Sequence, residues 1–450
     1  MVKASPIGIL VAATLLGAAT AHAKRPAPEP FFPVPVHQRT LDNGLRVVVA
    51  PMPGTGLASV RTVVRTGSRD EVEPGRTGFA HFFEHMMFRG TKKMPQEQRE
   101  RVVTAMGAST NAYTSDDLTV YIFDVAAEDL EQVMELEADR FMNLDYSEQQ
   151  FQTEAGAVYG EYRKNRASPQ FQLYEALAAK AYSRHTYGHT TMGYEKDIAA
   201  MPRMLAYSKR FFARFYRPEN TFLIVAGDVD PDATFALAEK HFAPWKKGYV
   251  APRVRREPEQ TAERRLEVRY DGKVLPLVVL AYKSPAYDPD SVAWVSSQVL
   301  AELAFGATSP VGKQLVLEER SAQRVDARPA VSRDPSLFTI TATVAEPGKL
   351  DAVITALEAA VARARDTAFD AQRVADAVSA IRYGLLLGLD RPAAVAERLA
   401  RVAALTGDAA AIERFIATLG RVTPETVRAA AQQILDPRRR TVGILKEKGQ

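Results

Sequence analysis

Apolar and polar residues alternate along the chain in a pattern that predicts strands and helices in a regular order. Short apolar runs rich in β-branched residues predict buried strands, and longer runs with helical spacing predict helices. The strands are expected over 47–51, 59–65, 120–125 and 221–227. The helices are expected over 78–88, 128–143 and 148–165, and Pro169 is expected to break the last of them.

A polar stretch over 246–261, rich in Lys, Arg, Pro and Glu, is predicted to be a linker, after which the same order of elements returns. Strands are expected over 266–270, 277–282 and 338–344, and helices over 291–303 and 349–365. Both halves close alike, with a helix followed by "RPENTFLIV" in the first and "DPRRRTVGIL" in the second. The predicted fold class is α+β, with two homologous sandwich halves of mostly antiparallel sheet and packed helices, related by internal duplication.

The two halves are expected to form half of a clamshell chamber. The predicted domains are 24–250, the half that contains the candidate chemical motif, and 263–450, its homologue without that motif, joined by a linker over 251–262.

The first 23 residues have the features of a signal peptide. Lys3 supplies a positive charge, residues 7–19 are apolar, and "AHA" at 21–23 fits a cleavage site. The apolar run is short for a membrane span, although an uncleaved anchor is the alternative interpretation. The expected location is the bacterial periplasm or the medium.

Composition narrows the function classes. The 450 residues are 46% hydrophobic and 25% charged, which is typical of a globular protein, and a net charge of +4 does not indicate nucleic-acid binding. The chain contains no cysteine, which excludes disulfides, thiolate metal ligands, a cysteine nucleophile and a lipid-modified cysteine.

The segment "GFAHFFEHMMFRGT" carries the candidate chemistry. His81 and His85 lie four residues apart, so on a helix both imidazoles project from one face and can bind one metal ion. Glu84 lies beside them, where a carboxylate can act as a general base on water. The competing interpretation is a helix whose histidines pack in the core, but polar residues of this kind are seldom buried in a core among Phe and Met.

A catalytic zinc site typically adds a third protein ligand. The helix "EQQFQTEAGAVYGEYRKN" offers Glu154 and Glu161, seven residues apart and therefore on one face. From spacing alone, either glutamate can bind the metal while the other orients a ligand. His185 and His189 also lie four residues apart, but they stand among Gly and Thr and are interpreted as ordinary loop residues.

These motifs resemble the pitrilysin and insulysin group of inverzincin peptidases, in the branch of mitochondrial processing peptidase. The resemblance covers nearly the whole chain after residue 23. It implies that His81, His85 and Glu161 bind one zinc ion per chain, that Glu84 is the base and that Glu154 supports the ligands. Glu161 follows His85 by 76 residues, which matches the family pattern.

The segment "GASTNAYTSDDLTVYIF" resembles the family's substrate strand. The resemblance implies that Asn111 and Ala112 contact the backbone of an extended peptide, which adds to the sheet edge by main-chain hydrogen bonds. The expected activity is zinc-dependent endopeptidase cleavage of extended peptides or unfolded segments.

The sequence departs from the family pattern in its second half, where complete members carry an Arg and a Tyr that reach the substrate. Aligned from Ser309, these positions hold Val316 and Gln323, and the nearby Arg320 and Arg324 are interpreted as surface charges. We therefore expect a zinc-bearing subunit whose homologous partner supplies the Arg/Tyr pair, with a homodimer as the alternative. A non-catalytic interaction subunit and a dedicated precursor-processing protease are the other candidate functions.

Overall fold

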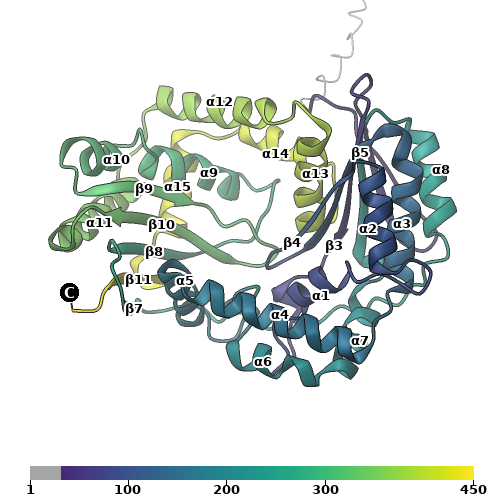
Figure 1. Ribbon diagram of the computed structural model, residues 1–450. Helices are drawn as coiled ribbons and strands as arrows, with labels where there is room; N and C mark the ends of the chain where they lie inside the picture. The colour runs from purple at the N-terminus through teal and green to yellow at the C-terminus, as the bar shows by residue number, and fades with distance from the viewer. Residues whose placement is uncertain (1–31, 450) are drawn as a thin grey trace, which may run out of the picture.

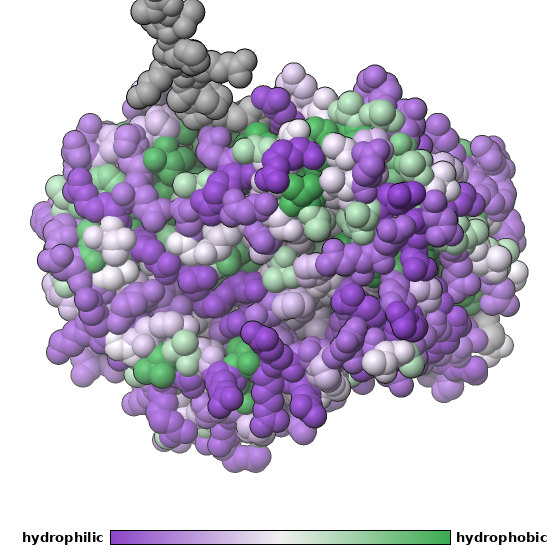
Figure 2. Space-filling model, turned by 180° about the vertical axis from the view of Figure 1, so that it is seen from behind, coloured by the Kyte–Doolittle hydropathy of each residue, from purple (hydrophilic) through white to green (hydrophobic). Residues whose placement is uncertain are grey.

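The computed structural model describes residues 32–449, so the signal peptide expected over residues 1–23 lies outside the described residues. Between residues 32 and 449 the chain forms two α+β halves that lie side by side (Figure 1). None of the helices in that range is long and apolar enough to cross a membrane. The face seen in Figure 2 is largely polar, with small scattered apolar patches.

The first half is built on a six-stranded sheet in the order β1-β2-β6-β3-β5-β4. Neighbouring strands are antiparallel except for β2 and β6, which are parallel. The strand β4 lies at one edge of this sheet. The strand bounds are β1 His37–Thr40, β2 Arg46–Pro51, β3 Leu57–Val64, β4 Ser109–Thr114, β5 Thr119–Ala126 and β6 Thr221–Gly227.

The second half is built on a five-stranded sheet in the order β7-β11-β8-β10-β9. Its strands are β7 Arg264–Tyr270, β8 Leu277–Ser284, β9 Ala322–Arg328, β10 Ser336–Val344 and β11 Arg440–Glu447. This sheet repeats β2-β6-β3-β5-β4 strand for strand, including one parallel pair, β7 with β11. The repeated topology confirms the predicted α+β fold of two related halves.

Helices cover both sheets. The first half contributes α1 Phe79–Met86, α2 Gln96–Ala105, α3 Leu130–Asn143, α4 Glu148–Arg166, α5 Pro169–Ala181, α6 Glu195–Ala200, α7 Leu205–Phe215 and α8 Pro231–Phe242. The second contributes α9 Val292–Phe305, α10 Pro310–Gly312, α11 Leu350–Asp366, α12 Ala371–Leu387, α13 Pro392–Thr406, α14 Ala411–Leu419 and α15 Pro424–Ile434.

Each sheet is also covered by a helix from the other half. The helix α13 packs on β3 and β6, on the face of the first sheet opposite to α1, and its Leu399 lies in one cluster with Val63 and Ile224. The helix α5 packs on β7 and β11, where Leu173 and Leu177 meet the apolar face of the second sheet. The strand β6 is buried along its whole length because it is covered from both sides.

The predicted elements differ from the observed ones mainly at their ends. The helix expected over 78–88 spans Phe79–Met86, with Gly78 as its N-cap, and the helix expected from Glu128 begins at Leu130 after a 3-10 turn. Pro169 does follow a break, but it also begins α5, where its missing N–H costs nothing. The edge strand β9 and most of the helices over 371–434 were not predicted.

Candidate metal centre

The helix α1 is fixed by its apolar face and by its N-terminus. Phe79, Phe82 and Phe83 are fully buried, and the ring of Phe83 stacks on Phe211 of α7 with centroids 5.4 Å apart. Gly78 adopts a left-handed φ of 91°, and a Cβ there would lie 2.8 Å from the carbonyl oxygen of Met192, so only glycine fits.

A buried carboxylate caps this helix. Glu71 accepts hydrogen bonds from the backbone N–H groups of Gly78 and Ala80, at 2.8 and 2.7 Å. Burial raises the pKa of Glu71 to about 8, although these N–H groups oppose the shift. With its apolar face and first turn held, α1 turns His81, Glu84 and His85 away from the Phe cluster.

The helix α4 presents the two glutamates. It begins with a capping box in which Ser147 and Gln150 satisfy each other's backbone N–H groups. Phe151, Ala155 and Val158 are buried on one face, and α4 packs against α1. This packing places Glu154 and Glu161 against the two histidines.

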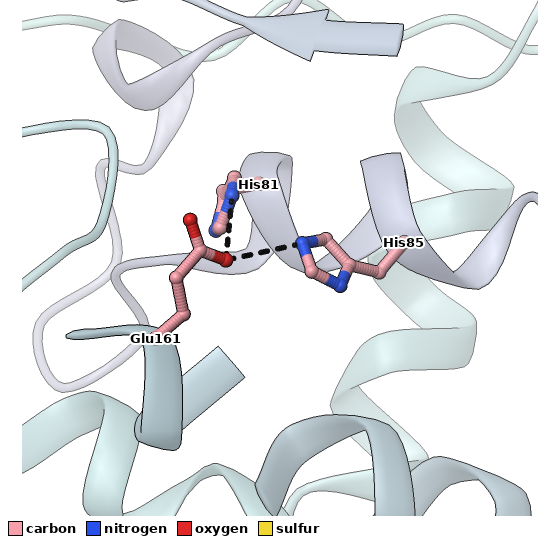
Figure 3. Close-up of side chains that lie close together, drawn as sticks. All are labelled: His81, His85 and Glu161. Carbon is pink, nitrogen blue, oxygen red and sulfur yellow. Dashed lines mark ion pairs between the residues drawn. The ribbon is translucent and has the colours of Figure 1, made fainter. Parts of the chain in front are cut away.

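His81, His85 and Glu161 converge on one point (Figure 3). Oε2 of Glu161 lies 3.7 Å from Nε2 of His81 and 3.4 Å from Nε2 of His85. One ligand atom from each of the three side chains lies within 4.8 Å of the other two. Among the described residues, 32–449, this trio is the group of at least three His, Cys, Asp or Glu side chains that could hold a metal ion. Its members are 4 and 76 residues apart in the sequence.

The donor set fits a zinc ion. Ligand atoms held about 2.0–2.1 Å from zinc at tetrahedral angles lie roughly 3.3–3.4 Å apart, close to the separations from Glu161 Oε2. Two imidazole nitrogens with one carboxylate oxygen are typical catalytic zinc ligands. Burial lowers the pKa of His81, which favours the neutral imidazole that binds metal.

Glu154 does not join this trio but holds one of its members. Its Oε1 lies 2.9 Å from Nδ1 of His85, so Nε2 of the same ring is directed at Glu161. Arg89 pairs with the other oxygen of Glu154. Burial would raise the pKa of Glu154, but the hydrogen bonds from His85 and Arg89 outweigh it and lower that pKa. The hydrogen bond to Glu154 in turn raises the pKa of His85.

Glu84 lies beside the trio and faces a hollow of about 570 Å³. The hollow is lined by Glu84, His85, Phe88, Arg89, Gln96, Asn111, Ala112 and Glu154. Oε2 of Glu84 accepts a hydrogen bond of 2.6 Å from the hydroxyl of Thr114 in β4. A carboxylate that is not part of the metal trio and faces an open space can accept a proton from water there.

Asn111 and Ala112 lie on the edge strand β4, where they pair with Ile122 and Tyr121 of β5. The opposite edge of β4 pairs with no described strand. Both residues line the hollow beside Glu84, so the structure brings the predicted substrate strand and the metal trio to one place.

The other singled-out residues lie elsewhere. His185 caps a 3-10 turn and its Nε2 lies 2.9 Å from Asp334, while His189 is buried and hydrogen-bonded to a backbone carbonyl. Val316 lies in a π-helical turn over Lys313–Glu318, and Gln323 lies on β9. Arg324 forms an ion pair with Asp326.

Two side chains at the site were not singled out from the sequence. Arg89 lies in the turn that follows α1, and its contact with Glu154 depends on how this turn packs against α4, so no local spacing indicates it. Thr114 lies three residues after Asn111 in the quoted strand motif, but its contact with Glu84 depends on how β4 packs on α1, and no local pattern indicates it.

Comparisons with known proteins identify the family of the chain. Residues 46–195 match the family model described as Insulinase (Peptidase family M16), and residues 206–381 match that of the Peptidase M16 inactive domain. The chain is 33% identical over 318 residues to the zinc protease PqqE of Helicobacter pylori, covering 69% of this chain and 70% of that protein. It is 28% identical over 415 residues to an uncharacterized zinc protease of Mycobacterium leprae, covering 90% of each chain.

The fold is shared as well. The crystal structure of a protease from Helicobacter pylori superimposes with a TM-score of 0.85 at 27% identity, covering 92% of this chain and all of that one. Sequence relatives and a full-length structural match therefore agree with the family models for both halves. The chain belongs to the insulinase family of peptidases, peptidase family M16.

Proposed function

We propose that the chain is a zinc-dependent endopeptidase that cleaves extended peptides or unfolded segments. In this proposal His81, His85 and Glu161 hold one zinc ion, Glu84 is the general base, and Glu154 orients His85. The observation that carries it is the convergence of two imidazole nitrogens and one carboxylate oxygen beside a further glutamate that faces a hollow. Similarity to proteins named zinc proteases supports the same assignment.

The chain's own residues supply the remaining chemistry. The free edge of β4, around Asn111 and Ala112, offers backbone N–H and C=O groups to an extended peptide. His81, His85 and Glu161 would hold a zinc ion, which would act as a Lewis acid and would lower the pKa of a bound water toward about 7. Glu84 takes a proton from the attacking water and passes it to the leaving amine, so the peptide bond is hydrolysed without a covalent intermediate.

The proposed substrates follow from strand addition. A segment that pairs with β4 must be extended and must have its own backbone groups free, which excludes segments inside folded domains. A dedicated role in processing one precursor peptide is compatible with the same site. The N-terminal pattern supports export, so we place this activity in the bacterial periplasm or outside the cell.

We further propose that a homologous subunit completes the site. Val316 and Gln323 stand where the resembled enzymes carry an Arg and a Tyr. Val316 has no hydrogen-bond donor for a developing oxyanion, and Gln323 offers only a neutral amide where those enzymes have a phenol. The second half of the chain also matches the family's inactive domain. These two observations keep a non-catalytic interaction subunit as the second candidate function, and a homodimer as the simpler assembly.

Glu84→Gln tests the proposed function. The variant keeps the shape of the side chain but cannot take up a proton at neutral pH, so peptide hydrolysis is expected to fall at least a thousandfold while bound zinc stays at one ion per chain. Glu128→Gln, an exposed glutamate ahead of α3, is the matched control and should behave as wild type. Hydrolysis that persists in Glu84→Gln would remove Glu84 from the mechanism.

The partner is tested by assaying the purified chain alone and together with a homologue encoded beside it. This homologue should carry the Arg/Tyr pair but lack residues equivalent to His81, Glu84 and His85. The chain alone should bind zinc and cleave peptides weakly, and the pair should cleave them well. Full activity of the chain alone would favour the homodimer. Zinc binding without cleavage in either assay would favour the interaction subunit.

A further inference from the structure

The hydroxyl of Thr114 donates a hydrogen bond of 2.6 Å to Oε2 of Glu84. We propose that Thr114 is a positioning residue for Glu84, and that it fixes the carboxylate in the orientation needed to accept a proton from water. This inference rests on the proposed function, because it assigns a role to Thr114 only if Glu84 is the general base.

The neighbouring hydroxyl, that of Thr119, does not compete for the hydrogen bond between Thr114 and Glu84. Thr119 lies opposite Thr114 in the hairpin, and its hydroxyl donates to the backbone carbonyl of Thr66 at 3.0 Å. The two hydroxyl oxygens are 3.5 Å apart, a longer distance than that from Thr119 to Thr66. Because a hydroxyl has one proton, Thr119 donates to Thr66 and not to Thr114. An ionised carboxylate accepts only, which fixes the direction of the bond from Thr114 to Glu84.

Thr114 is the last residue of β4, and the turn that follows it is held tightly by the first half. Ser68 donates to the carboxylate of Asp116 at 2.9 Å, and the backbone N–H of Arg69 donates to the carbonyl of Asp116 at 2.8 Å. A Cβ on Gly67 would lie 2.2 Å from the carbonyl oxygen of Ser115, so the two backbones touch there.

The second half of the chain holds the same turn from its other side. Asp117 is buried, and its carboxylate accepts from the hydroxyl of Tyr187 at 2.7 Å and from the backbone N–H of Arg333 at 3.0 Å. Arg333 lies in the loop between β9 and β10. The hairpin that carries Thr114 is therefore anchored by both halves.

Because its hairpin is anchored, Thr114 positions Glu84, and Glu84 does not position Thr114. The backbone of Thr114 is fixed by strand pairing and by the anchored turn, whereas the carboxylate of Glu84 stands at the end of three rotatable bonds. A hydrogen bond from a fixed hydroxyl selects one orientation of such a side chain. A general base that is displaced by a fraction of an ångström transfers protons less well.

The test compares two substitutions at one position in the assembly in which the wild-type chain is active. Thr114→Val has nearly the same shape and lacks the hydroxyl, whereas Thr114→Ser keeps the hydroxyl and lacks the methyl group. We expect kcat of Thr114→Val to fall about tenfold or more, with KM within about twofold and zinc content unchanged. Thr114→Ser should keep most of the wild-type kcat.

Two kinetic results would overturn the proposal. One is a wild-type kcat in Thr114→Val, and the other is an equal loss in both variants, which would assign the effect to packing of the methyl group. A lower melting temperature in Thr114→Val alone, with kcat retained, would likewise assign Thr114 a structural role only.

A crystal structure of Thr114→Val gives a readout that needs no activity. The carboxylate of Glu84 should leave its wild-type position in that variant and keep it in Thr114→Ser. An unmoved carboxylate in Thr114→Val contradicts the proposal. Activity that survives in Glu84→Gln would instead contradict the proposed function, so the two failures are distinguishable.

Discussion

The carboxylate of Asp334, in the second half of the chain, accepts a hydrogen bond of 2.7 Å from Nε of Arg69, in the first half. The same Oδ2 atom lies 2.9 Å from Nε2 of His185. Arg69 belongs to the turn that precedes Glu71, the cap of α1, and Asp334 belongs to the loop that anchors the β4–β5 turn. A single contact between the halves thus lies next to both elements that carry the candidate site.

Asp334→Ala should destabilise the protein at neutral pH. Burial would raise the pKa of Asp334, but the hydrogen bonds from His185 and Arg69 outweigh it and hold that pKa well below its usual range. Removing the carboxylate leaves Arg69 without this partner, and partly buried pairs broken in this way typically cost about 2–4 kcal/mol of unfolding free energy. Urea denaturation at pH 7 measures the loss.

The pH dependence follows from the sign of that shift. A carboxyl group with a depressed folded-state pKa contributes stability above its unfolded pKa of about 4 and loses it as the pH falls further. The difference between wild type and Asp334→Ala should therefore shrink below about pH 4. Asp271→Ala, at a position 91% exposed, is the control, and an equal loss there would contradict a specific role for Asp334.

Lys283→Met should stabilise the protein near neutral pH. Lys283 lies on β8 and is only 7% exposed, and among the described residues its Nζ has no hydrogen-bond partner. It lies 3.4 Å from the ring centroid of Tyr182. Burial lowers the pKa of Lys283 to about 7. A buried ammonium without a hydrogen bond costs folding free energy, which a methionine of similar length avoids.

The size of the stabilisation by Lys283→Met depends on pH. Between pH 7 and about 10.4 the unfolded chain binds a proton at Lys283 that the folded chain does not, so wild-type stability rises with pH in this window. The advantage of Lys283→Met, of the order of a few kcal/mol at pH 7, should narrow toward pH 10. Urea denaturation at pH 6.5, 8 and 9.5 tests this, with exposed Lys273→Met as the control. Parallel curves for wild type and Lys283→Met would refute the prediction.

Glu154→Gln should weaken zinc binding without removing a ligand. In the proposed zinc site Glu154 orients His85 through the 2.9 Å contact with Nδ1, and its charge favours the ring form that donates there. Loss of such a supporting carboxylate typically raises the Kd for zinc about 10- to 100-fold. Competition with a chelator of known zinc affinity measures the change. Glu148→Gln, exposed on the same helix, should leave the Kd unaltered, and an unaltered Kd in Glu154→Gln would show that Glu154 is not needed to orient His85.

Much of the first half could be predicted because its signals are local. The strands β2, β3, β5 and β6 follow from β-branched runs, and α1 and α4 follow from the helical spacing of their residues. The helices after Ala371 were missed because they are rich in alanine, and the apolar face of α13 is completed by the first sheet. The strand β9 was missed because its exposed Arg and Gln side chains give no apolar alternation.

The sequence by itself determined which groups share a helical face, because helical periodicity depends only on spacing. It placed His81, Glu84 and His85 together on one helix, Glu154 and Glu161 together on another, and predicted the repeated α+β order. Only the tertiary structure decided that Glu161 meets both histidines, that Thr114 reaches Glu84, and that α5 and α13 each cover the sheet of the other half. These contacts join residues 30 to more than 300 positions apart. They depend on how buried faces fit together, and no local pattern records that fit.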